Sequence, residues 1–343
     1  MSETLTEIGE FGLIDRIHEL LRVSGAPVPE KTLGIGDDCA FFQPRPGYDI
    51  LVTCDCIVEG RHYLTRFISP VNLGRRAMSL NISDIGAMGG RPLYALVSLG
   101  LRADTAVKDV EAMYLGFVEE LNPFDATIIG GNLTKSEGAN FIDITLIGEI
   151  EAGKSVRRSG ANPGDALLIT GYPGQAAAGL QILLKAPSVH DLEDHPLVRA
   201  YNTPSHRARE GWAVAHSGLA TAMIDTSDGL LGDLGHICKE SGVGALLIQE
   251  NLPVSSALQD AARQMKRDPI DLVLKDSDDY ELIITCPPEH VDGIRSAITG
   301  LNDIPVTEIG RITEMAGDIK LKSADGVYHN LTASGWDHFS TLG

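Results

Sequence analysis

The sequence contains no apolar run that approaches the ~20 residues of a membrane-spanning helix. Basic residues are also scarce, because 28 Lys and Arg stand against 47 Asp and Glu, a formal net charge of −19. Nonspecific nucleic-acid binding requires a positive surface. We therefore expect no nucleic-acid partner and no membrane partner. The overall charge is equally well interpreted as an acidic surface that serves only solubility.

The sequence contains only five cysteines, and no two of them have CxxC spacing. An odd number without zinc-like clusters favours reduced thiols and a cytoplasmic protein. The amino-terminal residues 1–17 are acidic and amphipathic, unlike a secretory signal peptide. No GxxxxGK[ST] motif occurs, so a Walker A nucleotide site is excluded.

The length of 343 residues favours two domains, which we place at 1–152 and 153–343. The stretch 151–164 between them is polar and rich in turn-forming residues. Periodicity in the first domain predicts helices at 9–22, 70–89 and 105–121 and strands at 49–58, 92–101, 126–130 and 141–150. In the second it predicts helices at 174–185 and 229–241, a loop at 186–206, and strands at 166–171, 220–224, 244–248, 280–286 and 306–312.

The first-domain pattern describes an α+β unit in which helices cover one face of a sheet. Its strands are apolar on both sides, so we expect the other face to be buried against a second subunit. Pro70 is predicted as the first residue of its helix, with Ser69 as the cap.

Acidic residues gather at strand ends and turns, where few basic residues can neutralise them. Asp38 lies in a glycine-rich loop, Asp55 in an apolar strand, and Asp84 on a helix three residues after Asn81. The turn 225–229, Asp-Thr-Ser-Asp-Gly, lies between a strand and a helix. Crowded carboxylates repel unless hard cations separate them, and Mg²⁺ prefers such oxygen ligands. The pattern therefore indicates magnesium-dependent phosphate chemistry.

Each of these signals has a structural alternative. The loop at 34–40 and the segment 276–281 are also typical of solvated turns, and Asp55 of a strand end that faces water. The Asn81–Asp84 pair and the turn 225–229 are equally typical of capping or interhelical hydrogen bonds. Other candidates are Gly131 for close approach of a phosphate, Arg157 or Arg158 for a phosphate fork, and His62 and Trp336 for substrate. Their structural alternatives are a plain turn, a solvated pair in the linker, a structural histidine and a tryptophan that closes a core.

The ordered motifs resemble the thiamine-monophosphate kinase family over nearly the whole chain. They are Gly-Ile-Gly-Asp-Asp-Cys-Ala at 34–40, Val-Glu-Gly-Arg-His at 58–62, Asn-Ile-Ser-Asp at 81–84, Arg-Ser-Gly-Ala at 158–161, Asp-Thr-Ser-Asp-Gly-Leu at 225–230, Asp-Tyr-Glu-Leu at 279–282 and Trp-Asp-His-Phe at 336–339. The wider superfamily includes aminoimidazole-ribonucleotide synthetase and selenophosphate synthetase. The latter would require a reactive Cys or selenocysteine near a glycine-rich amino terminus, which this sequence lacks.

The resemblance implies ATP-dependent phosphorylation of thiamine monophosphate to thiamine diphosphate, the last step of its biosynthesis, by direct in-line transfer. It implies a homodimer in which the amino-terminal mixed sheets join into a barrel, a carboxyl-terminal α/β sandwich domain, and ATP with several Mg²⁺ in a cleft between the domains. A monovalent cation is a further candidate cofactor. By motif, the implied metal ligands are Asp38, Thr53, Cys54 through its backbone, Asp55, Asp84, Asn132, Asp225 and Asp228. The implied ATP contacts are Gly131, Asn132, Arg158 and Ser227, and the implied substrate contacts are His62, Asp278 and Trp336.

Two positions depart from the family pattern. Asn132 replaces the usual Asp after Gly130-Gly131, and Asp278 replaces the usual Glu before Asp279. Asn still offers a neutral oxygen, but the site loses one negative charge. Two other functions therefore stay open: a superfamily enzyme that acts on a different acceptor, and a protein that binds nucleotide or thiamine phosphate without turnover.

Overall fold

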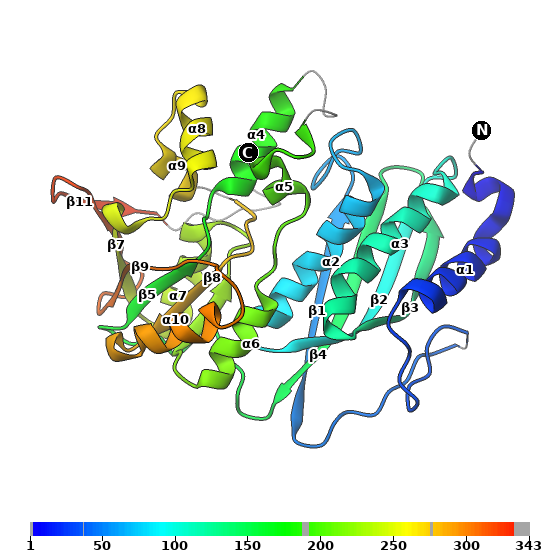
Figure 1. Cartoon of the computed structure of the whole chain (residues 1–343), viewed down its shortest axis with the longest axis horizontal. Helices are drawn as coiled ribbons and strands as arrows, with labels where there is room; N and C mark the ends of the chain where they lie inside the picture. The colour runs from blue at the N-terminus through cyan, green and yellow to red at the C-terminus, as the bar shows by residue number, and fades with distance from the viewer. Residues whose placement is uncertain (1–2, 37, 187–191, 275–276, 333–343) are drawn as a thin grey trace. The chain divides into compact units, whose positions relative to one another are not determined.

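The computed structural model describes residues 3–36, 38–186, 192–274 and 277–332 (Figure 1). The chain divides into two compact units. The first comprises Met1–Ile85 and Gly90–Gly153, and the second comprises Gly86–Gly89 and Lys154–Gly343. Among the described residues, no helix combines the length and apolar character needed to cross a bilayer. The functions that we assigned to the two predicted domains stay a prediction.

The first unit contains one mixed sheet with the strand order β1-β4-β2-β3. Only β2 and β3 pair in parallel, and the other neighbours are antiparallel. In Figure 1, α2 and α3 lie on the same face of this sheet, and α1 packs beside α3. The elements are α1 (Leu5–Ser24), β1 (Tyr48–Val58), α2 (Pro70–Ala87), β2 (Arg91–Leu101), α3 (Val107–Leu121), β3 (Thr127–Lys135) and β4 (Phe141–Glu151).

This order of elements confirms the strand–helix–strand–helix–strand–strand prediction. The start of α2 also follows the expected chemistry, since the Asn72 amide donates to Ser69 Oγ at 3.3 Å and Pro70 opens the helix. The core of the unit lies between helices and sheet, where Val97, Leu99 and Ile144 are at most 1% exposed.

The second unit contains a sheet with the strand order β11-β10-β7-β9-β5-β8-β6. Its strands are β5 (Ala166–Thr170), β6 (Ala222–Asp225), β7 (Gly244–Ile248), β8 (Leu282–Cys286), β9 (Val306–Thr313), β10 (Ile319–Lys322) and β11 (Tyr328–Leu331). Its helices are α4 (Gln175–Lys185), α5 (Pro196–Asn202), α6 (Ala208–Ser217), α7 (Leu230–Ser241), α8 (Ser256–Met265), α9 (Pro269–Leu274) and α10 (Val291–Thr299).

Helices cover both faces of this second sheet, which confirms the predicted α/β sandwich. Successive residues of β5 contribute to the hydrophobic cores on opposite faces of the sheet. Leu167 and Ile169 pack with α7 and α8, whereas Leu168 packs with α6 and α10. Continuously apolar strands such as Ala-Leu-Leu-Ile are typical of this arrangement, because both faces are buried.

Several predicted elements need correction. The segment 186–206 is not a continuous loop, because α5 begins at Pro196. Helices α6, α8, α9 and α10 and strands β10 and β11 were missed. These elements have ten residues or fewer, so each offers few turns or alternations from which a period can be recognised.

Candidate functional site

The first acidic cluster joins Thr53 and Asp55 of β1 to Asp84 of α2. The Thr53 hydroxyl donates to an Asp84 carboxylate oxygen, and the Asp55 and Asp84 carboxyls share a hydrogen bond. Burial, followed by the charges of Asp84 and Asp143, raises the pKa of Asp55 to about 6. The cluster thus concentrates negative charge in a half-buried place, which is the condition that a divalent cation relieves.

Strand alternation explains how Asp55 reaches this place. Residues 51, 53, 55 and 57 of β1 point to the same face of the sheet. Leu51 and Ile57 are buried, and Thr53 and Asp55 lie between them. Asp55 therefore occupies a core-facing position that an apolar side chain would normally fill. The alternative interpretation, a strand-end carboxylate in water, does not describe it.

Asn81 lies one helical turn before Asp84 and is fully buried. Its Nδ2 donates to the Ala77 carbonyl of the same helix at 3.1 Å, while its Oδ1 is buried without a hydrogen-bond partner. The side chain therefore bonds to its own helix rather than capping it or bridging to another helix.

The other predicted residues of the first unit lie in different environments. Asp38 is exposed in the loop before β1, and the Cys54 thiol is exposed. His62 is half-buried in the turn after β1, where the Val58 amide donates to its Nδ1 at 3.0 Å. In the neutral ring this bond leaves the proton on Nε2.

Gly131 and Asn132 lie on β3, next to β2. Gly131 pairs with Val97 of β2. On its other side Val97 pairs with Ile144 of β4, and Ile144 pairs with Asp55 of β1. A Cβ on Gly131 would lie 1.9 Å from the Val97 carbonyl oxygen, so only glycine permits this strand pairing. Asn132 is exposed in the adjacent register row, with Ser98 and Asp143.

The second acidic cluster is formed by the turn 225–229 and the start of α7. Asp225 ends β6 and is 1% exposed, whereas Ser227 and Asp228 are half-buried. Gly229 occupies the N-cap position, and no side-chain cap bond forms there. The N-cap residue itself therefore supplies no side-chain cap bond.

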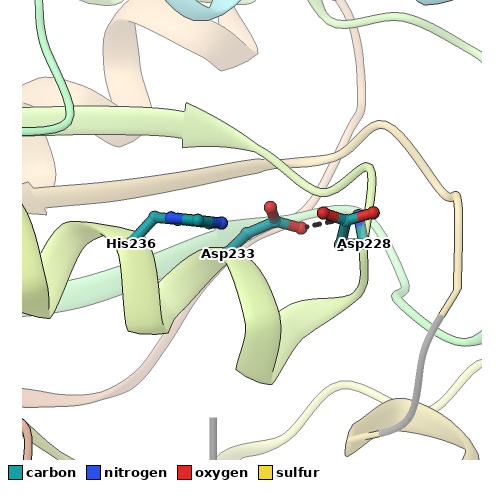
Figure 2. Close-up of side chains that lie close together, drawn as sticks. All are labelled: Asp228, Asp233 and His236. Carbon is teal, nitrogen blue, oxygen red and sulfur yellow. Dashed lines mark hydrogen bonds between the residues drawn. The ribbon is translucent and has the colours of Figure 1, made fainter. Parts of the chain in front are cut away.

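Sequence reasoning missed two members of this cluster, Asp233 and His236 of α7. Asp233 is 2% exposed and accepts a hydrogen bond from the Asp228 amide at 3.0 Å (Figure 2). Ligand atoms of Asp228, Asp233 and His236 lie within 4.8 Å of one another. The sequence feature that could have identified them is a charged residue within an apolar helix, about one helical turn after the acidic segment 225–229.

Charge also accumulates in this second cluster. Burial and the neighbouring charge of Asp225 raise the pKa of Asp233 to about 8, and the positive charge of Arg158 opposes this shift. Arg158 itself is exposed, and its backbone carbonyl accepts from Ser241 Oγ. The predicted ATP residue Arg158 is therefore electrostatically coupled to the carboxylates of this cluster.

The segment around Asp278 is not a solvated turn. Ser277, Asp279 and Glu281 are all at most 7% exposed, and Asp278 is half-buried. Asp279 accepts from the Gly174 amide at 2.5 Å and the Ala176 amide at 2.8 Å, so it caps the start of α4. Trp336, the third predicted substrate contact, lies outside the described residues.

Comparison with known proteins places these clusters in context. Residues 36–150 match the model for AIR synthase related protein, N-terminal domain, and residues 162–321 match the model for its C-terminal domain. Thiamine-monophosphate kinase of Aquifex aeolicus is 34% identical over 335 residues, 98% of this chain and 99% of the relative. The enzyme of Salmonella typhimurium is 35% identical over 339 residues, 97% of this chain and 99% of the relative.

Solved structures agree with the sequence comparison. Thiamine-monophosphate kinase from Stenotrophomonas maltophilia is similar with a TM-score of 0.79 and 32% identity, over 93% of this chain and 97% of that chain. A structure described as AaThiL complexed with AMPPCP and TMP is similar with a TM-score of 0.73 and 32% identity, over 99% of this chain and 100% of that chain. The hydrogenase maturation protein HypE, at 18% identity, shares the fold.

Proposed function

Because this chain belongs to the thiamine-monophosphate kinase family, we propose that it transfers the γ-phosphoryl group of ATP to thiamine monophosphate. The products are thiamine diphosphate and ADP, so the protein is a transferase of thiamine biosynthesis. The observation that carries the proposal is the cluster of Thr53, Asp55 and Asp84, in which two carboxyls share a hydrogen bond. An ATP analogue and TMP in a relative's structure support the two substrates.

Mg²⁺ suits the first cluster and the turn 225–229, because their donors are carboxylate and hydroxyl oxygens. When bound, it would neutralise phosphate charge during transfer. We assign it to residues from both units, several of them charged and partly buried. They are Asp38, Thr53, Cys54 through its carbonyl, Asp55, Asp84, Asn132, Asp225 and Asp228.

The remaining candidates would bind and orient the two substrates. We assign Gly131, Asn132, Arg158 and Ser227 to ATP, and His62, Asp278 and Trp336 to thiamine monophosphate. The attacking group is a phosphate oxygen of the substrate, which is already ionised at neutral pH. The protein therefore needs no strong general base, and its contribution is positioning and charge stabilisation. We expect no phosphoenzyme intermediate.

A coupled assay for thiamine diphosphate tests this function. Purified protein should form it from ATP and thiamine monophosphate in excess Mg²⁺, and EDTA should abolish the reaction. ADP release with another phosphate acceptor, and none with thiamine monophosphate, would instead indicate a different superfamily activity. Tight binding of both ligands without turnover would indicate a non-catalytic binding protein.

We further propose a homodimer formed through the open face of the first sheet, and a cytoplasmic location. Val52 is 64% exposed, and Cys54 and Cys56 follow it on the same exposed alternation of β1. Such a face is apolar enough to require a cover. The location is supported by the free state of all five cysteines.

Thiol alkylation at pH 8 reports on the dimer. Cys39 is exposed and should react quickly, whereas Cys238 and Cys286 should not, because burial raises the pKa of each thiol to about 11. Cys54 should be protected in the dimer, and Val52→Asp should dissociate the dimer and expose it. Light scattering gives the assembly state. Equal reaction rates of Cys54 and Cys39 in an intact dimer would contradict this interface.

A further inference from the structure

Two turns that we assign to different ligands are joined to each other in the second unit. The turn 225–229 carries the candidate metal ligands, and the segment 277–281 carries the candidate substrate residue Asp278. The Thr226 amide donates to the Glu281 carbonyl at 2.8 Å, and the Tyr280 amide donates to the Thr226 carbonyl at 2.9 Å. The Glu281 amide donates to Thr226 Oγ1 at 3.0 Å. Every one of these bonds passes through Thr226.

The Glu281 side chain continues this connection into the core. Arg207, at the start of α6, donates to Glu281 through Nε at 2.6 Å and through Nη2 at 2.5 Å. The Thr170 hydroxyl donates to the same carboxylate at 2.6 Å and accepts from the Leu282 amide at 2.8 Å. The Glu281 side chain is 5% exposed and that of Arg207 14% exposed, so this bidentate pair is shielded from water.

The backbone around the pair is specialised for it. Gly171 has a φ of +55°, and a Cβ there would lie 2.0 Å from Glu281 Oε1. Tyr280 has a φ of +56°, although it is not glycine and is 6% exposed. Such a conformation is costly and persists only where the surroundings enforce it. The conformation of the Asp278 segment is therefore fixed by its contacts.

We propose that Arg207, Glu281 and Thr170 form a positioning element that sets the spacing between the metal-binding turn and the substrate-binding segment. The inference rests on the proposed function, in which Asp228 holds metal and Asp278 contacts thiamine monophosphate. We place none of the three residues in contact with a reacting atom, because their side chains are buried or nearly so. They act through Thr226 and the backbone of residues 280–282, so their loss should displace the acceptor relative to the metal ligands.

Arg207→Lys tests the element, because it keeps the charge but cannot form the planar fork. Thr170→Val is the second, milder variant, and it removes only a buried hydroxyl. Both should reduce kcat/KM for thiamine monophosphate by about 10- to 100-fold, the scale of a small misplacement of reacting groups. The KM for ATP should change by less than about threefold.

Thr285→Val is the matched control. Thr285 is also fully buried on β8, but its hydroxyl joins the separate network of Thr221 and the Ala222 carbonyl. It should lower the melting temperature as Thr170→Val does while leaving kcat/KM unchanged. Equal kinetic losses in Thr170→Val and Thr285→Val, or melting changes without kinetic loss in Thr170→Val and Arg207→Lys, would overturn the proposal.

Hydrogen exchange separates this proposal from the proposed function. The amides of Thr226, Tyr280 and Glu281 should exchange slowly in the parent protein and faster in Thr170→Val, but remain slow in Thr285→Val. If the parent protein does not phosphorylate thiamine monophosphate, the proposed function fails and exchange alone decides whether the two turns are coupled. Unchanged exchange in Thr170→Val would show that they are not.

Discussion

Asp84→Asn is expected to reduce thiamine diphosphate formation by on the order of 10³-fold while the protein remains folded. Asp84 is the residue at which the first cluster converges, since it contacts both the Thr53 hydroxyl and the Asp55 carboxyl. Asn preserves the size of the side chain and its hydrogen-bonding capacity. It removes the charge that would bind a cation, so the loss reports on charge rather than on packing.

The measurement is the coupled assay over a Mg²⁺ titration, with circular dichroism and thermal melting to verify the fold. Melting without Mg²⁺ should not fall, because the substitution removes repulsion between two neighbouring carboxylates. Asn132→Asp is the matched control, since it adds a carboxylate on β3 at the position where the family usually has one. It should be tolerated, and full activity in Asp84→Asn would refute the assignment of Asp84 as a ligand.

Local sequence signals were sufficient for most of the first unit. Alternation on β1 and the Ser69-Pro70 start of α2 are short-range features. They were sufficient to place Asp55 on a strand and Asp84 on a helix. What the sequence could not show was the contact between the two carboxyls. That contact depends on how α2 packs on the sheet, and packing is not encoded within one window of residues.

The second unit shows the same limit more strongly. The acidic turn at 225–229 was recognisable, yet the buried roles of Asp279 and Glu281 were not, because their partners are 74 to 111 residues distant along the chain. 

The Gly174 amide lies 105 residues from Asp279, and Arg207 lies 74 residues from Glu281. A carboxylate that caps a distant helix has the same local pattern as one in a solvated turn. Short helices such as α6 and α10 were missed because tertiary packing, rather than a long apolar period, stabilises them.

Asp228→Asn is expected to lower activity by on the order of 10²- to 10³-fold and to raise the Mg²⁺ concentration required for half-maximal rate. Asp228 is half-buried at the turn before α7, and its backbone amide donates a hydrogen bond to the Asp233 carboxylate. The geometry alone also permits a metal bound by Asp228, Asp233 and His236 together. These two arrangements make different predictions, because Mg²⁺ prefers oxygen ligands and imidazole suits transition metals.

His236→Asn distinguishes them. His236 is exposed and lies on the same helix as Asp233 (Figure 2), so its replacement should not disturb the fold. If Asp228 serves a magnesium–phosphate site, His236→Asn should retain activity within about threefold while Asp228→Asn loses it. If the three residues bind one ion, both variants should lose activity together, and added Zn²⁺ or Ni²⁺ should bind the parent protein but not His236→Asn. The first outcome is the one that carboxylate crowding at the turn leads us to expect, since carboxylate oxygens are the ligands that Mg²⁺ prefers.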